Sequence, residues 1–284
     1  MIAFSDKDMS GGGIPYDESD FDKIRKILKE KSGISLNDSK MPLVYSRLSR
    51  RVRLCALPDF RSYVLFVSSS AGSEEQSCMI DALTTNVTNF FREKHHFEHF
   101  SQIVMPEIIQ RAQQGEKIRI WSSACSSGQE PFSIAMTILD RFPEVNNYNV
   151  KILATDISYE MIQFCRCGIY PDTETSSIPE KFLSKCSRKI GNEIYFSDEI
   201  KKMISFKNLN LLESWPMQCH FISIFCRNVA IYFERSIQNI LWQRLSDYLL
   251  PGGYLYIGHS EKIAQKTVPD ISACKCPTTY RKNI

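Results

Sequence analysis

Short apolar segments that alternate with helical patterns constrain this chain most strongly, because they limit its larger part to a layered α/β fold. The segments are RIWSSA (119–124), KILATD (151–156), FISIFC (221–226) and YLYIGH (254–259). Helical patterns begin near Pro131, run from Ser158 to about Cys167, and cover 235–253, where Pro-Gly-Gly ends the last one. Strands separated by helices are typical of βαβ units, so we expect a parallel sheet covered on both faces.

The residues before this region have helical patterns and no clear strand. Phe21, Ile24, Ile27 and Leu28 follow helical spacing with Asp20 as the expected N-cap, and further helices are expected over 43–54, 60–67 and 78–83. We therefore expect a mobile tail over 1–16, an all-helical domain over 17–85, and a second domain over 86–284. The region 168–210 interrupts the alternation and is expected to contain a small antiparallel β-subdomain.

Composition excludes several classes of protein. The formal net charge of +3 is too small to indicate a nucleic-acid partner, and no apolar run approaches the roughly 20 residues of a membrane span. The first residues do not resemble a secretion signal. The ten cysteines form no CxxC pair, and His95 and His99 lack the Glu of a HExxH zinc site. We therefore expect a reducing compartment and no metal ion.

Polar loops follow the predicted strands at the sheet edge where open parallel sheets bind ligands. The loop 125–130 contains Gly128, which permits close approach of a ligand, and Glu130, which either binds a ligand or stabilises a helix N-terminus. Asp156 ends the next strand and either accepts hydrogen bonds from ribose hydroxyls or caps the following helix. Arg227 and Asn228 follow a further strand, and the alternative to ligand binding is an Asn228 that holds the loop and an Arg227 on the surface.

Several segments together resemble the CheR family of chemotaxis receptor methyltransferases. The matching strings are ALTTNVTNFFREKHHF (82–97), RIWSSACSSGQEPFSIAM (119–136), ILATDIS (152–158), NLNLLE (208–213), FISIFCRNVAIYF (221–233) and GGYLYIGHSE (252–261). They occur in the family's order and spacing, and SGISLNDSKMPLVYSRLSRRVR (32–53) resembles its helical domain. The resemblance implies a Rossmann-like methyltransferase domain with a small antiparallel β-subdomain, preceded by an all-helical N-terminal domain.

The resemblance also implies an activity. The cofactor is S-adenosylmethionine, the product is S-adenosylhomocysteine, and the acceptors are glutamate side chains on cytoplasmic helices of chemoreceptors, which become methyl esters during sensory adaptation. The enzyme is expected to be cytoplasmic and monomeric. The alternatives are a methyltransferase with another acceptor, such as a nucleic acid or a small molecule, and a signalling module that binds S-adenosylmethionine without catalysis.

Family roles can be assigned to positions of this sequence that match its motifs. Arg92 and Tyr232 are expected at the reacting centre. The resemblance assigns cofactor binding to Asn86, Thr88, Arg92, Glu130, Asp156, Asn210, Leu211, Cys226, Arg227 and Asn228. Arg47, Arg50, Arg51 and Arg53 lie on one helix that is expected to dock on acidic receptor helices, although a solvated polar face is the alternative.

Two departures from the family pattern are visible. The loop that usually reads STGEEP is SSGQEP here, so Gln129 replaces an acid while Glu130 is kept. The segment RKIGNEIYF (188–196) is short and does not match members that bind a receptor's C-terminal pentapeptide.

The residues suit ester formation on a carboxylate. A glutamate side chain has a pKa of about 4.3 and is already an anion at neutral pH. It therefore needs alignment with the methyl donor rather than a general base. Arg92 is suited to hold that carboxylate, because a guanidinium binds both oxygens.

Overall fold

The computed structural model describes residues 13–264 and 266–284, which form two compact units. One unit contains the described residues up to Lys31 together with Ser35–Leu83, and the other contains Ser32–Ile34 and Thr84–Ile284 apart from residue 265. Most of the tail expected over 1–16 lies outside the described residues. The N–H of Ile14 donates to the hydroxyl of Tyr45, and the ring of Tyr16 lies 4.4 Å from that of Phe60.

The first unit is helical, with α1 (Glu18–Ser32), α2 (Met41–Leu54), α3 (Phe60–Val67) and α4 (Ser73–Leu83). Its core is formed by apolar residues spaced three and four apart, among them Ile24, Leu28 and Leu48, none of which has exposed surface. The expected N-cap at Asp20 is wrong by one turn. The carboxylate of Asp17, directly before α1, accepts from the N–H of Asp20 at 2.9 Å and so satisfies a free donor of the first turn.

The second unit is built on a seven-stranded sheet with the order β6-β2-β1-β7-β8-β10-β9. Its strands are β1 (Ile118–Ser122), β2 (Val150–Asp156), β6 (Ile204–Asn208), β7 (Phe221–Cys226), β8 (Leu249–Ile257), β9 (Ile271–Ala273) and β10 (Thr279–Lys282). The first five strands in that order are parallel, and β10 is antiparallel to both β8 and β9. Every residue of β7 is buried, as expected for a central strand covered on both faces.

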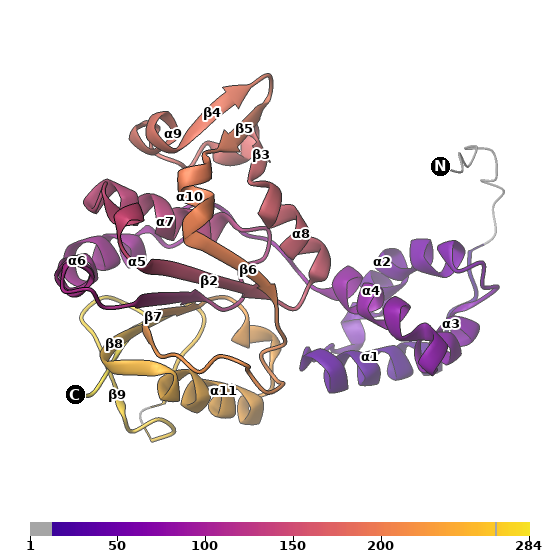
Figure 1. Cartoon of the computed structure of the whole chain (residues 1–284). Helices are drawn as coiled ribbons and strands as arrows, with labels where there is room; N and C mark the ends of the chain where they lie inside the picture. Colours follow the sequence, from indigo (N-terminus) through magenta and orange to yellow (C-terminus); the bar gives the residue numbers. More distant parts are fainter. Residues whose placement is uncertain (1–12, 265) are drawn as a thin grey trace. The chain divides into compact units, whose positions relative to one another are not determined.

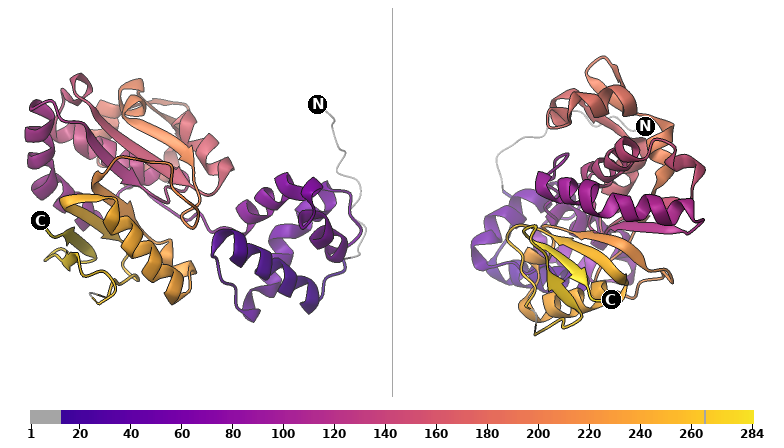
Figure 2. Two further views of the ribbon diagram at one scale, coloured as in Figure 1. Left: turned by 60° about the horizontal axis from the view of Figure 1, so that its bottom comes forward. Right: turned by 90° about the vertical axis from the view of Figure 1, so that its left-hand side faces the viewer.

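Helices cover this sheet on both faces. The helices of this unit are α5 (Lys94–His99), α6 (Met105–Gln113), α7 (Gln129–Arg141), α8 (Tyr159–Cys167), α9 (Glu180–Cys186), α10 (Asp198–Met203) and α11 (Arg235–Asp247). Helices α7 and α11 lie on opposite faces (Figures 1 and 2). Because β1, β2 and β7 are parallel, their carboxyl ends meet at one edge of the sheet. None of the described helices is long and apolar enough to cross a membrane.

The predicted β-subdomain is a separate three-stranded antiparallel sheet with the order β3-β5-β4. Its strands are β3 (Ile169–Pro171), β4 (Ser187–Ile190) and β5 (Glu193–Phe196). Strand β6 also lies in the region predicted to be inserted, yet it pairs with β2 at the edge of the main sheet. The fold class predicted from the sequence is confirmed.

One predicted helix is shorter than expected. The pattern over 235–253 suggested a helix that Pro-Gly-Gly ends, but α11 ends at Asp247. Leu249 is already paired with Phe221 in β8, and the register shifts before Ser223 pairs with Tyr254. The Pro-Gly-Gly segment therefore accommodates a bulge inside a strand, where Gly252 has a φ of 79°.

Candidate active site

A pocket lies at the carboxyl ends of β1, β2 and β7, where their loops meet the segment 84–92. Between its walls, about 910 Å³ is not filled by protein atoms, and this volume includes open solvent at the mouth. Its lining includes the predicted residues Asn86, Thr88, Arg92, Glu130, Asp156, Asn210, Leu211, Arg227, Asn228 and Tyr232. The structure thus brings together nearly all of the residues that the sequence assigned to cofactor binding and to the reacting centre.

Backbone strain is concentrated at this pocket. Six described residues other than glycine have a positive φ, and four of them lie in the loops around the pocket. These four are Phe91 at 54°, Glu93 at 56°, Ser126 at 49° and Asn228 at 58°. Such conformations persist only where surrounding contacts hold them, and they concentrate at functional sites.

Asp156 joins the loops after β1 and β2. One carboxylate oxygen accepts from the N–H of Ser126 at 2.7 Å, and the other accepts from the N–H of Ser158 at 2.9 Å. Ser158, not Asp156, is the N-cap of α8, because its hydroxyl accepts from the N–H of Met161. Burial raises the pKa of Asp156 although these hydrogen bonds oppose the effect. The capping alternative for Asp156 is therefore wrong.

Glu130 lies in a buried chain of opposite charges. Its carboxylate accepts from the hydroxyl of Ser122 at 2.7 Å and from the guanidinium of Arg227 at 3.1 Å. Arg227 also lies 3.3 Å from the carboxylate of Glu93 and donates to the backbone carbonyl of Arg92. Burial raises the pKa of Glu130, although the charge of Arg227 opposes it. A ligand cation beside Glu130 would offset that burial.

Glu93 has a role in the site that the sequence pattern did not predict. Burial disfavours its charge, but the charge of Arg227 and hydrogen bonds from His259 and Asn228 outweigh burial and lower the pKa of Glu93 to about 2. Glu93 therefore ties the start of α5 to the loops after β7 and β8. Its position directly after Arg92, within a motif rich in ionisable groups, was the signal available in the sequence.

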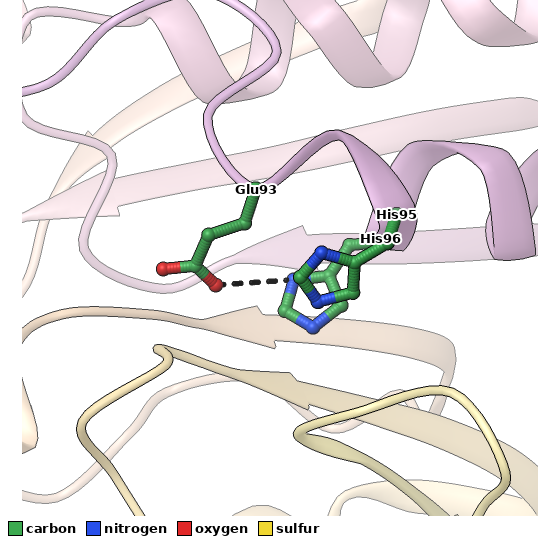
Figure 3. Close-up of side chains that lie close together, drawn as sticks. All are labelled: Glu93, His95 and His96. Carbon is green, nitrogen blue, oxygen red and sulfur yellow. Dashed lines mark ion pairs between the residues drawn. The ribbon is translucent and has the colours of Figure 1, made fainter.

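Glu93, His95 and His96 point toward one another (Figure 3). Among the described residues, theirs is the one group of at least three potential metal ligands with atoms within 4.8 Å of one another. Burial and the charge of Arg227 together lower the pKa of His96 to about 3. Because the guanidinium of Arg227 already lies beside Glu93, a metal ion here would face a fixed positive charge. The absence of a metal ion stays a prediction.

Arg92 belongs to the segment that forms one wall of the pocket. Its guanidinium donates to the backbone carbonyl of Val87 at 3.0 Å, and its side chain is half-buried. The preceding Phe90 is buried against Tyr170, with ring centroids 5.1 Å apart, and the N–H of Phe91 donates to the hydroxyl of Ser133. These contacts anchor the backbone on which Arg92 is carried.

Glu261 organises the loop after β7, a role that was also not predicted from the sequence. Its carboxylate accepts from the N–H groups of Asn228, Val229, Ala230, Ile231 and Gly258, at 2.5 to 3.3 Å. Tyr232 follows directly and lines the pocket. Burial raises the pKa of Glu261, and the backbone hydrogen bonds oppose that shift. An acid three residues after a strand-end glycine was the signal that could have identified it.

The remaining cofactor assignments separate into two groups. Asn210 and Leu211 line the pocket after β6, where the carbonyl of Leu211 accepts from Arg244 at 2.8 Å. Cys226 is fully buried at the end of β7 and does not line the pocket. Burial raises the pKa of the Cys226 thiol well above its usual value. Its place is in the core beneath the site.

The four predicted docking arginines differ in their surroundings within the helical unit. Arg51 binds both carboxylate oxygens of Glu75, and Arg47 donates to the carbonyl of Leu83 at 2.9 Å. Arg50 and Arg53 are exposed. The charge available for a partner on this helix is therefore carried mainly by Arg50 and Arg53.

This arrangement is suited to a ligand with several positive or donor groups. Glu130 and Asp156 are buried carboxylates on neighbouring loops, and each has a pKa raised by burial. An ammonium or sulfonium near them and a pair of ribose hydroxyls would satisfy their oxygens. Arg92 and Tyr232 line the same pocket. The pocket therefore fits S-adenosylmethionine.

Comparison with known proteins gives the same result. Residues 86–279 match the family model described as "CheR methyltransferase, SAM binding domain", and residues 19–84 match "CheR methyltransferase, all-alpha domain". A probable chemotaxis protein methyltransferase of Rhizobium etli is 44% identical over 242 residues, which cover 84% of this chain and 90% of that protein. The chemotaxis protein methyltransferase of Borreliella burgdorferi is 38% identical, covering 94% and 95% of the two chains. That of Escherichia coli is 36% identical, covering 87% and 85%.

Proposed function

The chain belongs to the CheR family of methyltransferases, and from this premise we propose that it esterifies glutamate side chains of chemoreceptors. The methyl group comes from S-adenosylmethionine, and the products are a glutamate methyl ester and S-adenosylhomocysteine. The single observation that carries the proposal is that Glu130, Asp156, Arg92 and Tyr232, drawn from separate parts of the sequence, line one pocket.

Bound S-adenosylmethionine supplies an electrophilic methyl group on a sulfonium. The chain's own residues bind and align. Asp156 would receive the ribose hydroxyls, and Glu130, backed by Arg227, would receive the ammonium of the methionine part. These two contacts would hold the cofactor in the pocket that Arg92 and Tyr232 also line.

The acceptor carboxylate is held by Arg92 and lies along Tyr232. A bond forms between a carboxylate oxygen and the methyl carbon as the carbon–sulfur bond breaks, and the electron pair of that bond stays on sulfur. No proton moves, so no general base is needed. Alignment of the two reactants supplies the rate gain, and effects of this kind reach several kcal/mol.

The acceptor is a protein, and charge helps to recruit it. Arg50 and Arg53 are exposed on α2 and would attract acidic receptor helices. The enzyme acts as a monomer in the cytoplasm, where the receptor helices are exposed. S-adenosylmethionine sensing without catalysis is the second candidate, and the presence of Arg92 and Tyr232 in the pocket favours catalysis.

Release of methanol tests this proposal. The enzyme is incubated with methyl-labelled S-adenosylmethionine and membranes that contain chemoreceptors, and volatile label is measured after alkali. Base-labile label on receptors is expected, with loss of most turnover in Arg92→Ala while S-adenosylhomocysteine still binds. Base-stable label would indicate another acceptor, and absence of label would indicate a binding module.

A further inference from the structure

A second hollow lies beside the methyl-transfer pocket and shares a wall with it. Asn86, Val87 and Thr88 line both, and about 740 Å³ between the walls of the second hollow, which we call the side groove, is not filled by protein atoms. Its other lining residues are Asn89, Ser127, Gln129, Thr173, Glu174, Ser176 and Ser177. The far wall thus belongs to the segment after β3, at the base of the three-stranded sheet.

The side groove is lined almost entirely by hydroxyl and amide side chains. Glu174 is its one ionisable lining residue, and it is exposed. Val87 is its one large apolar residue and is 78% exposed on the rim shared with the pocket. Such a lining can satisfy amide, hydroxyl or cationic side chains by hydrogen bonds. It offers a carboxylate no charged partner, and Glu174 would repel it.

Gln129 connects the side groove to the cofactor loop. It is 3% exposed. Its amide oxygen accepts from the hydroxyl of Ser127 at 2.8 Å, and its amide nitrogen donates to the carboxylate of Glu174 at 3.3 Å. This hydrogen bond steadies Glu174 at the groove. A carboxylate at position 129 would instead repel the carboxylate of Glu174. The amide of Gln129 is therefore the partner that allows an acid at position 174.

The shared wall also controls the reacting centre. The carbonyl of Val87 accepts from the guanidinium of Arg92 at 3.0 Å, so the backbone that separates the two hollows holds the arginine assigned to the acceptor. Val87 is exposed where the two hollows adjoin, so an acceptor chain that enters the pocket over this residue has the side groove beside it. On a helix, residues three or four positions away lie about 5–6 Å apart on the same face, close enough to enter the neighbouring hollow.

We propose that the side groove binds the side chain three or four residues from the acceptor glutamate and selects an amide, hydroxyl or basic residue there over an acid. The inference rests on the proposed function, because it assumes a helical protein acceptor. Glu174 is the specificity-determining residue, and Gln129 positions it.

The test uses a cytoplasmic chemoreceptor fragment with a single acceptor glutamate. Positions three and four residues to either side of it are changed one at a time to Gln, Lys or Glu. The kcat/KM for methanol-releasing ester formation is measured with the wild-type enzyme, Glu174→Gln, Glu174→Lys and the control Glu144→Lys. Glu144 is exposed just beyond the far end of α7. Calorimetry with S-adenosylhomocysteine checks that the cofactor site is intact in each variant.

The wild type and Glu144→Lys should prefer Lys or Gln over Glu at one of these positions by about twofold to fivefold. This is the size expected for a single exposed charge contact of about 0.5–1 kcal/mol. Glu174→Gln should remove the preference for Lys, and Glu174→Lys should reverse it. If all enzyme variants ranked the fragments identically by kcat/KM, the assignment of the side groove would be overturned, while the proposed function would stand. Failure of the wild type to form base-labile ester on any fragment would overturn the proposed function, and the groove assignment with it.

Discussion

At the scale of single residues, the site depends on acids whose surroundings differ. Burial raises the pKa values of Glu130 and Asp156, whereas the charge of Arg227 and hydrogen bonds from His259 and Asn228 overcome burial and lower that of Glu93 to about 2. Glu93 therefore stays charged and fixes the loops, whereas the proposed ligand would stabilise the charged forms of Glu130 and Asp156. Residues that hold the site and residues that bind in it are distinguished in this way.

Glu130→Gln should weaken S-adenosylmethionine binding about tenfold to a hundredfold, because a charge-assisted hydrogen bond contributes about 1.5–3 kcal/mol. The pH dependence follows from the raised pKa of Glu130. The ligand's ammonium binds the ionised carboxylate, so lowering the pH protonates Glu130 and weakens binding. This loss should begin above the pH at which an ordinary glutamate, with a pKa of about 4.3, is protonated.

Calorimetric titrations from pH 8 to pH 5 measure this effect, with Glu144→Gln as the control for an exposed acid. The control should behave as the wild type, and Glu130→Gln should lose much of the pH dependence. Equal pH profiles for the wild type and Glu130→Gln would exclude Glu130 as the group that titrates.

Glu261→Gln should lower kcat more than it weakens cofactor binding. The carboxylate accepts from the backbone N–H groups that precede Tyr232, including that of Ala230 at 2.7 Å, and an amide can accept fewer of these bonds. We expect a loss of about 1–3 kcal/mol in the free energy of unfolding, the usual range for buried donors left unsatisfied. Urea unfolding and steady-state kinetics measure the two effects, and unchanged kcat in a folded variant would contradict the positioning role.

At the scale of elements, the turn between β1 and α7 brings its backbone close to other chain segments. Gly128 has a φ of 96°, and a Cβ there would lie 2.5 Å from the hydroxyl of Tyr170 and 2.8 Å from the sulfur of Cys165. Gly191, in the turn between β4 and β5, has a φ of 61°, and a Cβ added there would have no atom within 4 Å. The two glycines share a conformation and differ in crowding, so one is a control for the other.

Gly191→Ala should reduce the free energy of unfolding by about 1 kcal/mol from backbone strain alone. Gly128→Ala should reduce it by about 1–3 kcal/mol more, because overpacking adds to the strain, and it should weaken S-adenosylhomocysteine binding. Thermal unfolding and calorimetry compare the two variants. Equal losses of stability with equal affinity would show that the turn tolerates a side chain.

The elements show what could be read from the sequence. Strands β1, β2 and β7 were predicted almost to the residue because continuous apolar runs mark buried parallel strands. The end of α11 was misplaced because Pro-Gly-Gly is also suited to a bulge, here in β8. Strands β9 and β10 were missed since they are short and partly exposed. The placement of β6 in the main sheet depends on long-range pairing with β2, which no local pattern encodes.

The site was partly predictable for the same reason. Asp156 and Glu130 follow strands and could be selected by position. Glu93 and Glu261 act through contacts with residues 135 and 33 positions away, respectively, and such pairings appear only in the folded chain. Cys226 was assigned to the pocket only through the resemblance to the CheR family. Its side chain is fully buried, so it does not line the pocket.

At the scale of the whole molecule, the arginines proposed to recruit the receptor and the pocket proposed for methyl transfer belong to different units. Reversing both Arg50 and Arg53 to Glu should raise the Michaelis constant for receptor and make it less sensitive to salt, with little change in kcat. The matched control reverses Lys23 and Lys26, which are exposed on α1 of the same unit. Initial rates at several salt concentrations give the Michaelis constants of both double variants. If the arginine and lysine reversals had similar effects, Arg50 and Arg53 would be ordinary solvated residues without a docking role.

The central claim is that neighbouring loops at the carboxyl edge of the sheet hold the nucleoside of S-adenosylmethionine through Asp156. Calorimetric titration with S-adenosylhomocysteine tests it most directly, comparing the wild type with Asp156→Asn and with Asp140→Asn, whose carboxylate pairs with Lys181 on α9. We predict one bound molecule per chain, at least about tenfold weaker binding in Asp156→Asn, and unchanged binding in Asp140→Asn. Absence of heat with the wild type, or equal affinity in all three proteins, would contradict the account.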